Sequence, residues 1–454
     1  MTSPRQLSPR KQTDHATRAV LEQLPTLTHR GLVVEAPPGA GKSTLVAQAA
    51  ETLAQSSGPC PVIAQTNSQV DHLVRRFAHN HPHLRTARLT SADHAVPDDL
   101  RAHSGVRIGT RIEDLERTAD VIVGTAMKWA TVTDRRWPWA VIDEAYQMRS
   151  DMLLRTAALF DQALFVGDPG QLDPFSTVRT DRFAGMSHDP MHSAVAVLLA
   201  NNPALPVHCL PVSWRLPPSA VPVISDAFYP FTPFQAGSNE SDRTLKFAIV
   251  GMRTATDQAI EHAARTGWAL FELPARITHQ LDTEAIHAVL EIAERLLARG
   301  AIATCEENPK GHVLRPNDIA IGTTHRSQVH HIRALLARHH PRLHGVTVDT
   351  ANRLQGCERR ITIALHPLSG RSDASAFHLE AGRLCVLTSR HRHTCIVVAR
   401  AGIAELLDAH PSSAPARPGP ASRIPDGWEA HHTVLAHLAQ HTVRAQAHPR
   451  RRRG

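Results

Sequence analysis

The sequence predicts an α/β protein with parallel sheets in two tandem domains. Short apolar runs alternate with stretches of helical period, which is typical of parallel α/β units. The runs fall into two groups, and the segment between them, residues 201–211, is rich in Asn and Pro. With 454 residues, of which 42% are hydrophobic, the chain can fill such cores. We expect domains at residues 1–204 and 205–408.

Each apolar run in the two groups predicts one strand. The first group comprises GLVVEA (31–36), PVIAQT (61–66), DVIVGT (120–125), WAVIDE (139–144) and ALFVGD (163–168). The second group comprises LKFAIVG (245–251), WALFELP (268–274), DIAIGTT (318–324), GVTVDT (345–350), ITIAL (361–365) and CIVVA (395–399). Residues 409–454 read as a Pro-rich linker, a short helix-like piece and a basic tail.

Charge and cysteine usage narrow the class of partner and compartment. A net charge of +8 favours a polyanionic partner such as nucleic acid, although proteins without such a partner also carry a moderate basic excess. The six cysteines form no C-x-x-C pair, so we expect neither a disulfide framework nor a cysteine zinc site. The polar N-terminus and the lack of a long apolar stretch predict a cytoplasmic protein without a membrane span.

The string GAGKST, residues 39–44, predicts a phosphate-binding loop between a strand and a helix. Backbone N–H groups there can cradle phosphates, the Lys42 ammonium adds a positive charge, and the Ser43 hydroxyl can bind Mg²⁺. An ordinary Gly-rich turn does not require Lys followed by Ser. The expected ATP-binding residues are Pro38, Gly39, Ala40, Gly41, Lys42, Ser43 and Thr44.

Ala36 stands where such loops commonly begin with Gly. It precedes Pro37, which favours an extended backbone, so no glycine is required there.

Two adjacent carboxylates, Asp143 and Glu144, follow the apolar strand WAVI. Ligands of open α/β sheets bind at the carboxyl ends of strands. Asp143 is therefore the expected Mg²⁺ ligand, and Glu144 is expected to orient and deprotonate the attacking water. Taken alone, an Asp-Glu pair is usually a solvated turn. Together with the phosphate loop, the pair favours a catalytic site that uses ATP and Mg²⁺.

Further strings follow one another in a fixed order. They are APPGAGKS (36–43), AQTNSQVDHLVRRF (64–77), ADVIVGTAMKWA (119–130), DEAYQ (143–147), GDPGQLDPF (167–175), LPVSWRLPPSAVPVISDAFY (210–229), TVDTANRLQGCERRITIAL (347–365) and GRLCVLTSRHRHTCIVVA (382–399). These strings and their order resemble the motif set of superfamily 1 helicases. The forms DEAYQ and QGCE (355–358) resemble those of the 1B branch of this superfamily. The resemblance implies two tandem RecA-like P-loop domains with parallel sheets and short accessory insertions.

The resemblance also implies roles for residues around ATP. Gln171 would sense the γ-phosphate or its water, and Arg215 and Arg390 would act as arginine fingers. Trp214 would stack on adenine, although the residue type alone also suits a core position. The last string, residues 382–399, resembles motif VI of the family, but it reads SRHR where T-R-A-[RK] is usual, which makes the finger role of Arg390 less certain. The remaining nucleotide contacts implied are Gly356, Glu358 and Gln12.

Small polar residues are the nucleic-acid contacts that the resemblance implies. They suit phosphate contacts, which position a strand without reading its sequence. These residues are Thr66, Asn67, Thr125, Thr350 and Gln355. The C-terminal Arg run reads either as a solvated tail or as a further phosphate contact.

Three functions are compatible with these motifs. The first is an ATP-dependent helicase or translocase that hydrolyses ATP between its two domains and moves 5′ to 3′ on single-stranded DNA or RNA. The second is an ATP-gated module for nucleic acid or a partner protein, with ATPase activity but no duplex unwinding. Short insertions and the altered motif VI favour it. The third is a P-loop ATPase unrelated to nucleic acid.

We expect the protein to be a monomer.

Overall fold

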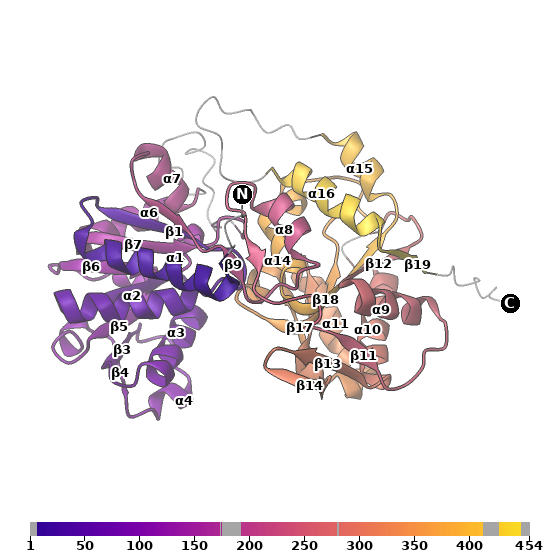
Figure 1. Ribbon diagram of the computed structural model, residues 1–454, viewed down its shortest axis with the longest axis horizontal. Helices are drawn as coiled ribbons and strands as arrows, with labels where there is room; N and C mark the ends of the chain where they lie inside the picture. Colours follow the sequence, from indigo (N-terminus) through magenta and orange to yellow (C-terminus); the bar gives the residue numbers. More distant parts are fainter. Residues whose placement is uncertain (1–6, 173, 175–191, 279–280, 412–425, 446–454) are drawn as a thin grey trace, which may run out of the picture. The chain divides into compact units, whose positions relative to one another are not determined.

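The computed structural model describes residues 7–172, 174, 192–278, 281–411 and 426–445. It divides into two compact units (Figure 1). The first comprises residues 1–169 and 173–212, and the second comprises 170–172 and 213–454. The join lies eight residues beyond the expected position because β8 pairs with β1 and so belongs to the first sheet. Most of the Pro-rich linker and the terminal Arg run lie outside the described residues.

The first unit is built on an eight-stranded parallel sheet with the order β4-β3-β5-β2-β6-β7-β1-β8. Its strands are β1 Gly31–Glu35, β2 Cys60–Ala64, β3 Thr86–Leu89, β4 Val106–Gly109, β5 Val121–Thr125, β6 Trp137–Ile142, β7 Phe160–Gly167 and β8 Val207–Cys209. Its helices are α1 Pro9–Gln23, α2 Lys42–Ser57, α3 Asn67–Asn80, α4 Asp98–Arg101, α5 Ala126–Trp129, α6 Ser150–Thr156 and α7 Ala194–Asn201. Short 3-10 turns are η1 Leu24–Thr26, η2 Ile112–Asp114, η3 Ala145–Gln147 and η4 Ala157–Leu159.

Helices cover both faces of this sheet. Along β1, Leu32 and Val34 belong to the core shared with α1, α2 and α3. Val33 belongs to the core on the opposite face, which includes residues of α5, α6 and α7. A strand buried on both faces is apolar at every position, which explains the continuous apolar runs in the sequence.

The second unit is built on a six-stranded parallel sheet with the order β16-β15-β17-β18-β12-β19. Its strands are β12 Trp268–Leu273, β15 Ile319–Thr323, β16 Thr347–Thr350, β17 Arg359–Leu365, β18 His391–Arg400 and β19 Thr442–Arg444. Its helices are α8 Val221–Phe228, α9 Ala255–Thr266, α10 Thr283–Ala298, α11 Arg326–His339, α12 Ala351–Leu354, α13 Ala376–Leu379, α14 Ala381–Thr388, α15 Ile403–Ala409 and α16 Gly427–Ala439. The described 3-10 turns are η6 Pro316–Asp318 and η7 Pro341–Leu343.

Two small sheets accompany the large ones. β9 Val212–Ser213 pairs with β10 Gln235–Ala236, and β13 Ala301–Cys305 lies between β11 Leu245–Phe247 and β14 Asn308–Val313. The run 245–251, expected in the second parallel sheet, instead forms β11 and pairs antiparallel with β13. Because Ile249 and Val250 beyond β11 are exposed, the apolar run overstates the length of this strand.

The segment expected to be a tail completes the second unit. Within it, α16 buries Ala430, Val434 and Leu438 in the same core as α8 and α14. β19 pairs parallel with β12 and forms one edge of the sheet. The expected boundary at residue 409 therefore does not end the second domain, because residues 427–444 carry an apolar face and an edge strand.

The described helices include none whose length and apolar character would allow it to cross a membrane. The six cysteines all lie in the described part of the chain, and none of them is in a disulfide there.

Candidate functional site

The phosphate loop connects β1 to α2 in the first unit. Gly39 and Gly41 have φ values of 76° and 92°, a region that side chains with a Cβ rarely adopt. Gly41 caps α2, and the first N–H groups of a helix have no intrahelical partner. Ala36 is buried and extends the β1–β7 ladder, since its N–H donates to the Gly167 carbonyl at 2.9 Å. Its backbone conformation therefore does not require glycine.

The Lys42 ammonium is held inside the loop by two acceptors. It donates to the Ala36 carbonyl at 3.3 Å and to Asp168 Oδ2 at 3.0 Å. Asp168 is buried and directly follows β7, the strand beside β1. Sequence reasoning gave Asp168 no role, because only the sheet order brings it next to the loop. A bound phosphate would compete with this carboxylate for the ammonium.

Asp143 is a buried carboxylate at the end of β6. Burial, together with the charge of the adjacent Glu144, raises the pKa of Asp143 to about 7. Its Oδ1 atom is buried and has no hydrogen-bond partner among the residues that the structure describes. Mg²⁺ prefers oxygen ligands, and it is bound through few carboxylates together with phosphates and water. The Asp143 carboxylate and the Ser43 hydroxyl fit that requirement.

Glu144 has a left-handed backbone, with φ 49° and ψ 46°. In the described part of the chain, only Asp134 and Arg253 share this feature among non-glycine residues. Such residues cost about 1–3 kcal/mol of strain each and cluster at functional sites. The half-buried Glu144 side chain accepts a hydrogen bond at Oε2 from Gln147 Nε2 at 3.0 Å. The carboxylate is thus oriented by both its backbone and a neighbouring amide.

A chain of glutamine amides connects Glu144 to the start of α3. Gln147 Oε1 accepts from Gln69 Nε2 at 3.1 Å. Gln69 Oε1 in turn accepts from the Thr66 N–H at 2.9 Å, completing a capping box. Gln65 Nε2 donates to the Asp143 carbonyl at 3.2 Å. Sequence reasoning missed these glutamines, although Thr66 followed three residues later by Gln is a recognisable helix-start signal.

Three of the predicted nucleic-acid contacts lie at the carboxyl ends of neighbouring strands. β2 and β5 pair so that Ala64 lies opposite Thr125, and Thr66 follows two residues later. Both Thr side-chain oxygens accept from helix N–H groups, so each hydroxyl proton can still be donated. Asn67 accepts from Arg88 at Oδ1, at 3.2 Å, so its NH₂ group is the part suited to a phosphate.

Arg76 of α3 reaches the start of α2. Its Nη2 atom donates to Thr44 Oγ1 at 2.5 Å. The side chain is half-buried, and desolvation lowers the pKa of Arg76 while the charge of Asp143 opposes that shift. The string 64–77 contains this arginine, but the pairing with Thr44 could not be read from it. Arg76 therefore adds positive charge beside the phosphate loop.

In the second unit, Arg215 and Glu358 form an ion pair. Arg215 Nε lies 3.1 Å from Glu358 Oε2, and Glu358 Oε1 is also 3.5 Å from Arg392 Nη1. Arg215 Nη1 is buried without a hydrogen-bond partner among the described residues. Gly356, with φ 78°, forms the turn that leads to Glu358. The structure thus brings together three residues predicted to face the nucleotide, and it adds Arg392.

Trp214 rests on a glycine. A Cβ added to Gly237 would lie 2.4 Å from Trp214 Cε3, so the indole and the glycine backbone are in close contact. Trp214 is 36% exposed, whereas Trp129 and Trp268 are fully buried. Arg243 fixes the main chain here by donating to the Trp214 and Arg215 carbonyls. Trp214 is therefore not a plain core aromatic, and an accessible indole can accept a flat base.

We expect Gly237→Val to weaken binding of an adenine nucleotide as strongly as Trp214→Ala does, by ~1–3 kcal/mol. The valine side chain would displace the indole of Trp214, whereas Trp214→Ala removes the indole, so both lose the stacking surface. Trp214→Phe should retain most of the affinity. Titration of a fluorescent ATP analogue checks this, with melting temperatures to show that each variant is folded. Unchanged affinity in Gly237→Val and Trp214→Ala would exclude stacking at this position.

Arg390 is buried at the end of α14. Its Nε donates to the Val386 carbonyl at 3.2 Å and its Nη2 to Ser389 Oγ at 2.9 Å. The next residue, His391, has its ring edge against Trp268, with the ring centroids 5.1 Å apart. Burial lowers the pKa of His391 to about 3, so this ring is neutral at physiological pH. The unusual motif VI histidine is a core residue, and the finger role of Arg390 stays a prediction.

Gln171 belongs to a three-residue segment, 170–172, that packs within the second unit. A Cβ added to Gly382 of α14 would lie 2.5 Å from the Gln171 carbonyl carbon, and one added to Gly170 would lie 2.6 Å from Tyr229 Cζ. Leu172 joins a small core with residues of α12 and α14. Gln171 is thus held by the motif VI helix, which the sequence did not reveal.

The other predicted contacts have the following surroundings. Thr350 is buried at the start of α12. Gln355, just after α12, is half-buried, and its Nε2 has no partner in the described residues. Gln12 lies in the first turn of α1, and its Nε2 donates to the Leu7 carbonyl at 2.7 Å. These assignments remain predictions.

Two family models match the chain, and each describes an AAA domain. One covers residues 12–193 and the other covers 192–402. The parallel sheets and the phosphate loop, together with these matches, define a P-loop NTPase with two tandem RecA-like domains. Within that class, the chain is similar to the superfamily 1 helicases, because it carries motifs that resemble theirs in the same order.

Solved structures with detectable similarity include the helicase nonstructural protein 10 of an arterivirus. A crystal structure of it is 11% identical, with a TM-score of 0.41, covering 86% of this chain and 61% of that one. A complex of that helicase with DNA has the same identity and TM-score and covers 87% and 65%. The nsp10 helicase of PRRSV is 14% identical, with a TM-score of 0.22, covering 87% and 58%. This chain therefore spans less than two thirds of the length of these proteins. No curated protein matches it.

Proposed function

We propose that the chain is a nucleic-acid-dependent ATPase of the helicase and translocase type, acting on single-stranded DNA or RNA. The observation that carries the proposal is the hydrogen-bond chain from Thr66 through Gln69 and Gln147 to Glu144. It joins the segment suited to phosphate contacts with the carboxylate suited to activate water. A shift of the strand-binding segment would therefore change the orientation of the catalytic carboxylate.

The residues divide the chemistry of ATP hydrolysis among them. The loop N–H groups and Lys42 would hold the β- and γ-phosphates, after Lys42 leaves Asp168. Ser43 and Asp143 would hold Mg²⁺, which neutralises phosphate charge when bound. Glu144 would take the proton of the attacking water, and Gln171 would position that water or the γ-phosphate.

Arginines of the second unit would complete the reaction. Arg215, with Arg390 as the second candidate, would neutralise charge that develops on the γ-phosphoryl group. Since Lys42 and Glu144 belong to the first unit, hydrolysis would require both units, and each cycle would move the strand. DEAYQ and QGCE favour branch 1B and therefore 5′ to 3′ movement.

The rate of ATP hydrolysis, measured with and without single-stranded DNA and RNA, tests this function. We expect at least one of the two to stimulate turnover about tenfold or more, which would also identify the substrate. Gln69→Leu should lose most of this stimulation, because it breaks the glutamine chain, whereas Ser68→Ala on the exposed side of the same turn should keep it. Turnover that responds to neither polymer would contradict the proposal and leave a P-loop ATPase unrelated to nucleic acid.

A second candidate is an ATP-gated binding module without unwinding activity. The altered motif VI favours this candidate, because the Arg390 side chain donates a hydrogen bond to the Val386 carbonyl of α14, the helix that precedes it. A labelled duplex with a 5′ single-stranded tail separates the two functions. A helicase releases the labelled strand in the presence of ATP, whereas a binding module hydrolyses ATP without releasing it.

A further inference from the structure

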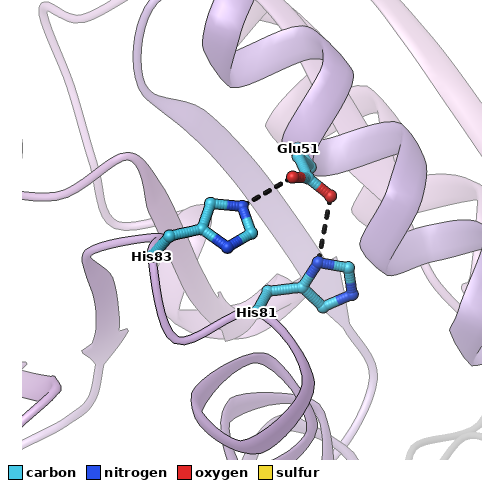
Figure 2. A group of neighbouring side chains, drawn as sticks. All are labelled: Glu51, His81 and His83. Carbon is cyan, nitrogen blue, oxygen red and sulfur yellow. Dashed lines mark hydrogen bonds and ion pairs between the residues drawn. The ribbon is translucent and has the colours of Figure 1, made fainter.

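Two histidines and a glutamate converge in the first unit, at the end of α3 (Figure 2). Glu51 Oε2 lies 3.0 Å from His81 Nδ1, and Glu51 Oε1 lies 2.6 Å from His83 Nε2. One ligand atom of each residue lies within 4.8 Å of the others. None of the three residues has a part in the proposed ATPase.

The local fold preorganises both histidines. His81 caps α3, with its N–H donating to the Phe77 carbonyl at 2.8 Å. Residues 81–84 form a turn closed by the Leu84 N–H donating to the His81 carbonyl at 2.9 Å. Pro82, at the second position, restricts the turn backbone. Because Phe77 and Leu84 are buried, the turn is anchored on both sides, and Figure 2 shows both imidazoles directed at Glu51.

The donor set selects the kind of ion. Imidazole nitrogen suits zinc and its transition-metal neighbours, whereas Mg²⁺ and Ca²⁺ prefer oxygen. Two His and one Glu form a known three-ligand set for zinc, with a fourth position for water. Zinc bonds of ~2.0–2.1 Å in a tetrahedron place ligand atoms ~3.3 Å apart. The side chains have room for the rotation that this spacing requires, because the His83 side chain is 56% exposed and the Glu51 side chain 24%.

We propose that His81 Nδ1, His83 Nε2 and a Glu51 oxygen bind one Zn²⁺ ion, with water at the open position. The ion would replace the protons that the imidazoles now share with the carboxylate. Since Glu51 lies in the middle of α2 and the histidines follow α3, the ion would join the middle of α2 to the C-terminal end of α3. α2 begins at Lys42 of the phosphate loop, and α3 begins beside Thr66, a predicted nucleic-acid contact. The ion would therefore hold in place the two helices that carry these residues.

Zinc titration of the full-length, untagged and metal-free protein against a chromogenic chelator tests the site. We expect one tight site, with at least ~100-fold weaker binding in His83→Ala and in Glu51→Gln. The matched control is His79→Ala, which alters an exposed histidine on the last turn of α3 that does not belong to this set of residues. It should bind zinc as the unchanged protein does.

Thermal unfolding gives a second measurement that does not depend on ATPase activity. Bound zinc should raise the melting temperature of the unchanged protein and of His79→Ala, and a chelator should reverse the increase. His83→Ala, altered at an exposed side chain, should fold and show no zinc-dependent increase. Equal zinc affinity and equal stabilisation in His83→Ala and the unchanged protein would overturn the proposal and leave an ordinary ion-paired cluster. An equal loss in His79→Ala would also overturn it.

Discussion

Glu144→Gln is expected to bind ATP normally and to hydrolyse it ~10²–10⁴-fold more slowly, the range that general-base catalysis commonly contributes. The amide keeps the size of the side chain and can still accept from Gln147 Nε2, so the hydrogen bond at 3.0 Å survives. It cannot take a proton from water. The substitution therefore removes one chemical step and leaves the geometry of the loop unchanged.

Steady-state ATP turnover and nucleotide affinity, measured on the same preparation, check this expectation. Asp134→Asn is a matched control, because it makes the same carboxylate-to-amide change at another left-handed residue, which is exposed. It should retain normal turnover. Near-normal hydrolysis in Glu144→Gln would show that another group activates the water.

Arg215→Ala is expected to lower kcat by ~10³-fold or more, as loss of an arginine finger does in other NTPases. Its buried Nη1 atom has no acceptor in the described structure, so it is available to a phosphoryl oxygen. The substitution should cost little stability, because Glu358 keeps its second partner, Arg392. Arg215→Lys should not restore the rate, since an ammonium cannot reproduce the planar guanidinium.

Single-turnover hydrolysis separates the loss of chemistry from the loss of ATP binding. Arg444→Ala serves as the control within the same unit, because it removes only an exposed pair with Glu272 and should leave the rate unchanged. Arg390→Ala, by contrast, should lower the melting temperature, since it empties a buried and hydrogen-bonded position. A normal kcat in Arg215→Ala would remove the finger role from this residue.

Local patterns in the sequence predicted the features that depend on neighbouring residues. The five strands expected in the first domain are all present, because a strand between two helical layers must be apolar throughout. Short or polar strands were missed. β3, β4 and β19 contain polar residues, and their partners in the sheet provide the stability that their own sequence lacks.

The sequence by itself therefore determined the P-loop, the two carboxylates that follow β6, and the order of motifs that resembles the superfamily 1 helicases. Each depends on residues within one short string, where backbone conformation and spacing follow from residue type. The tertiary structure decided which distant side chains meet: Lys42 with Asp168, Gln69 with Gln147, and Glu51 with His81 and His83. Pairs such as these arise from the order of strands and the packing of helices, which no local pattern encodes.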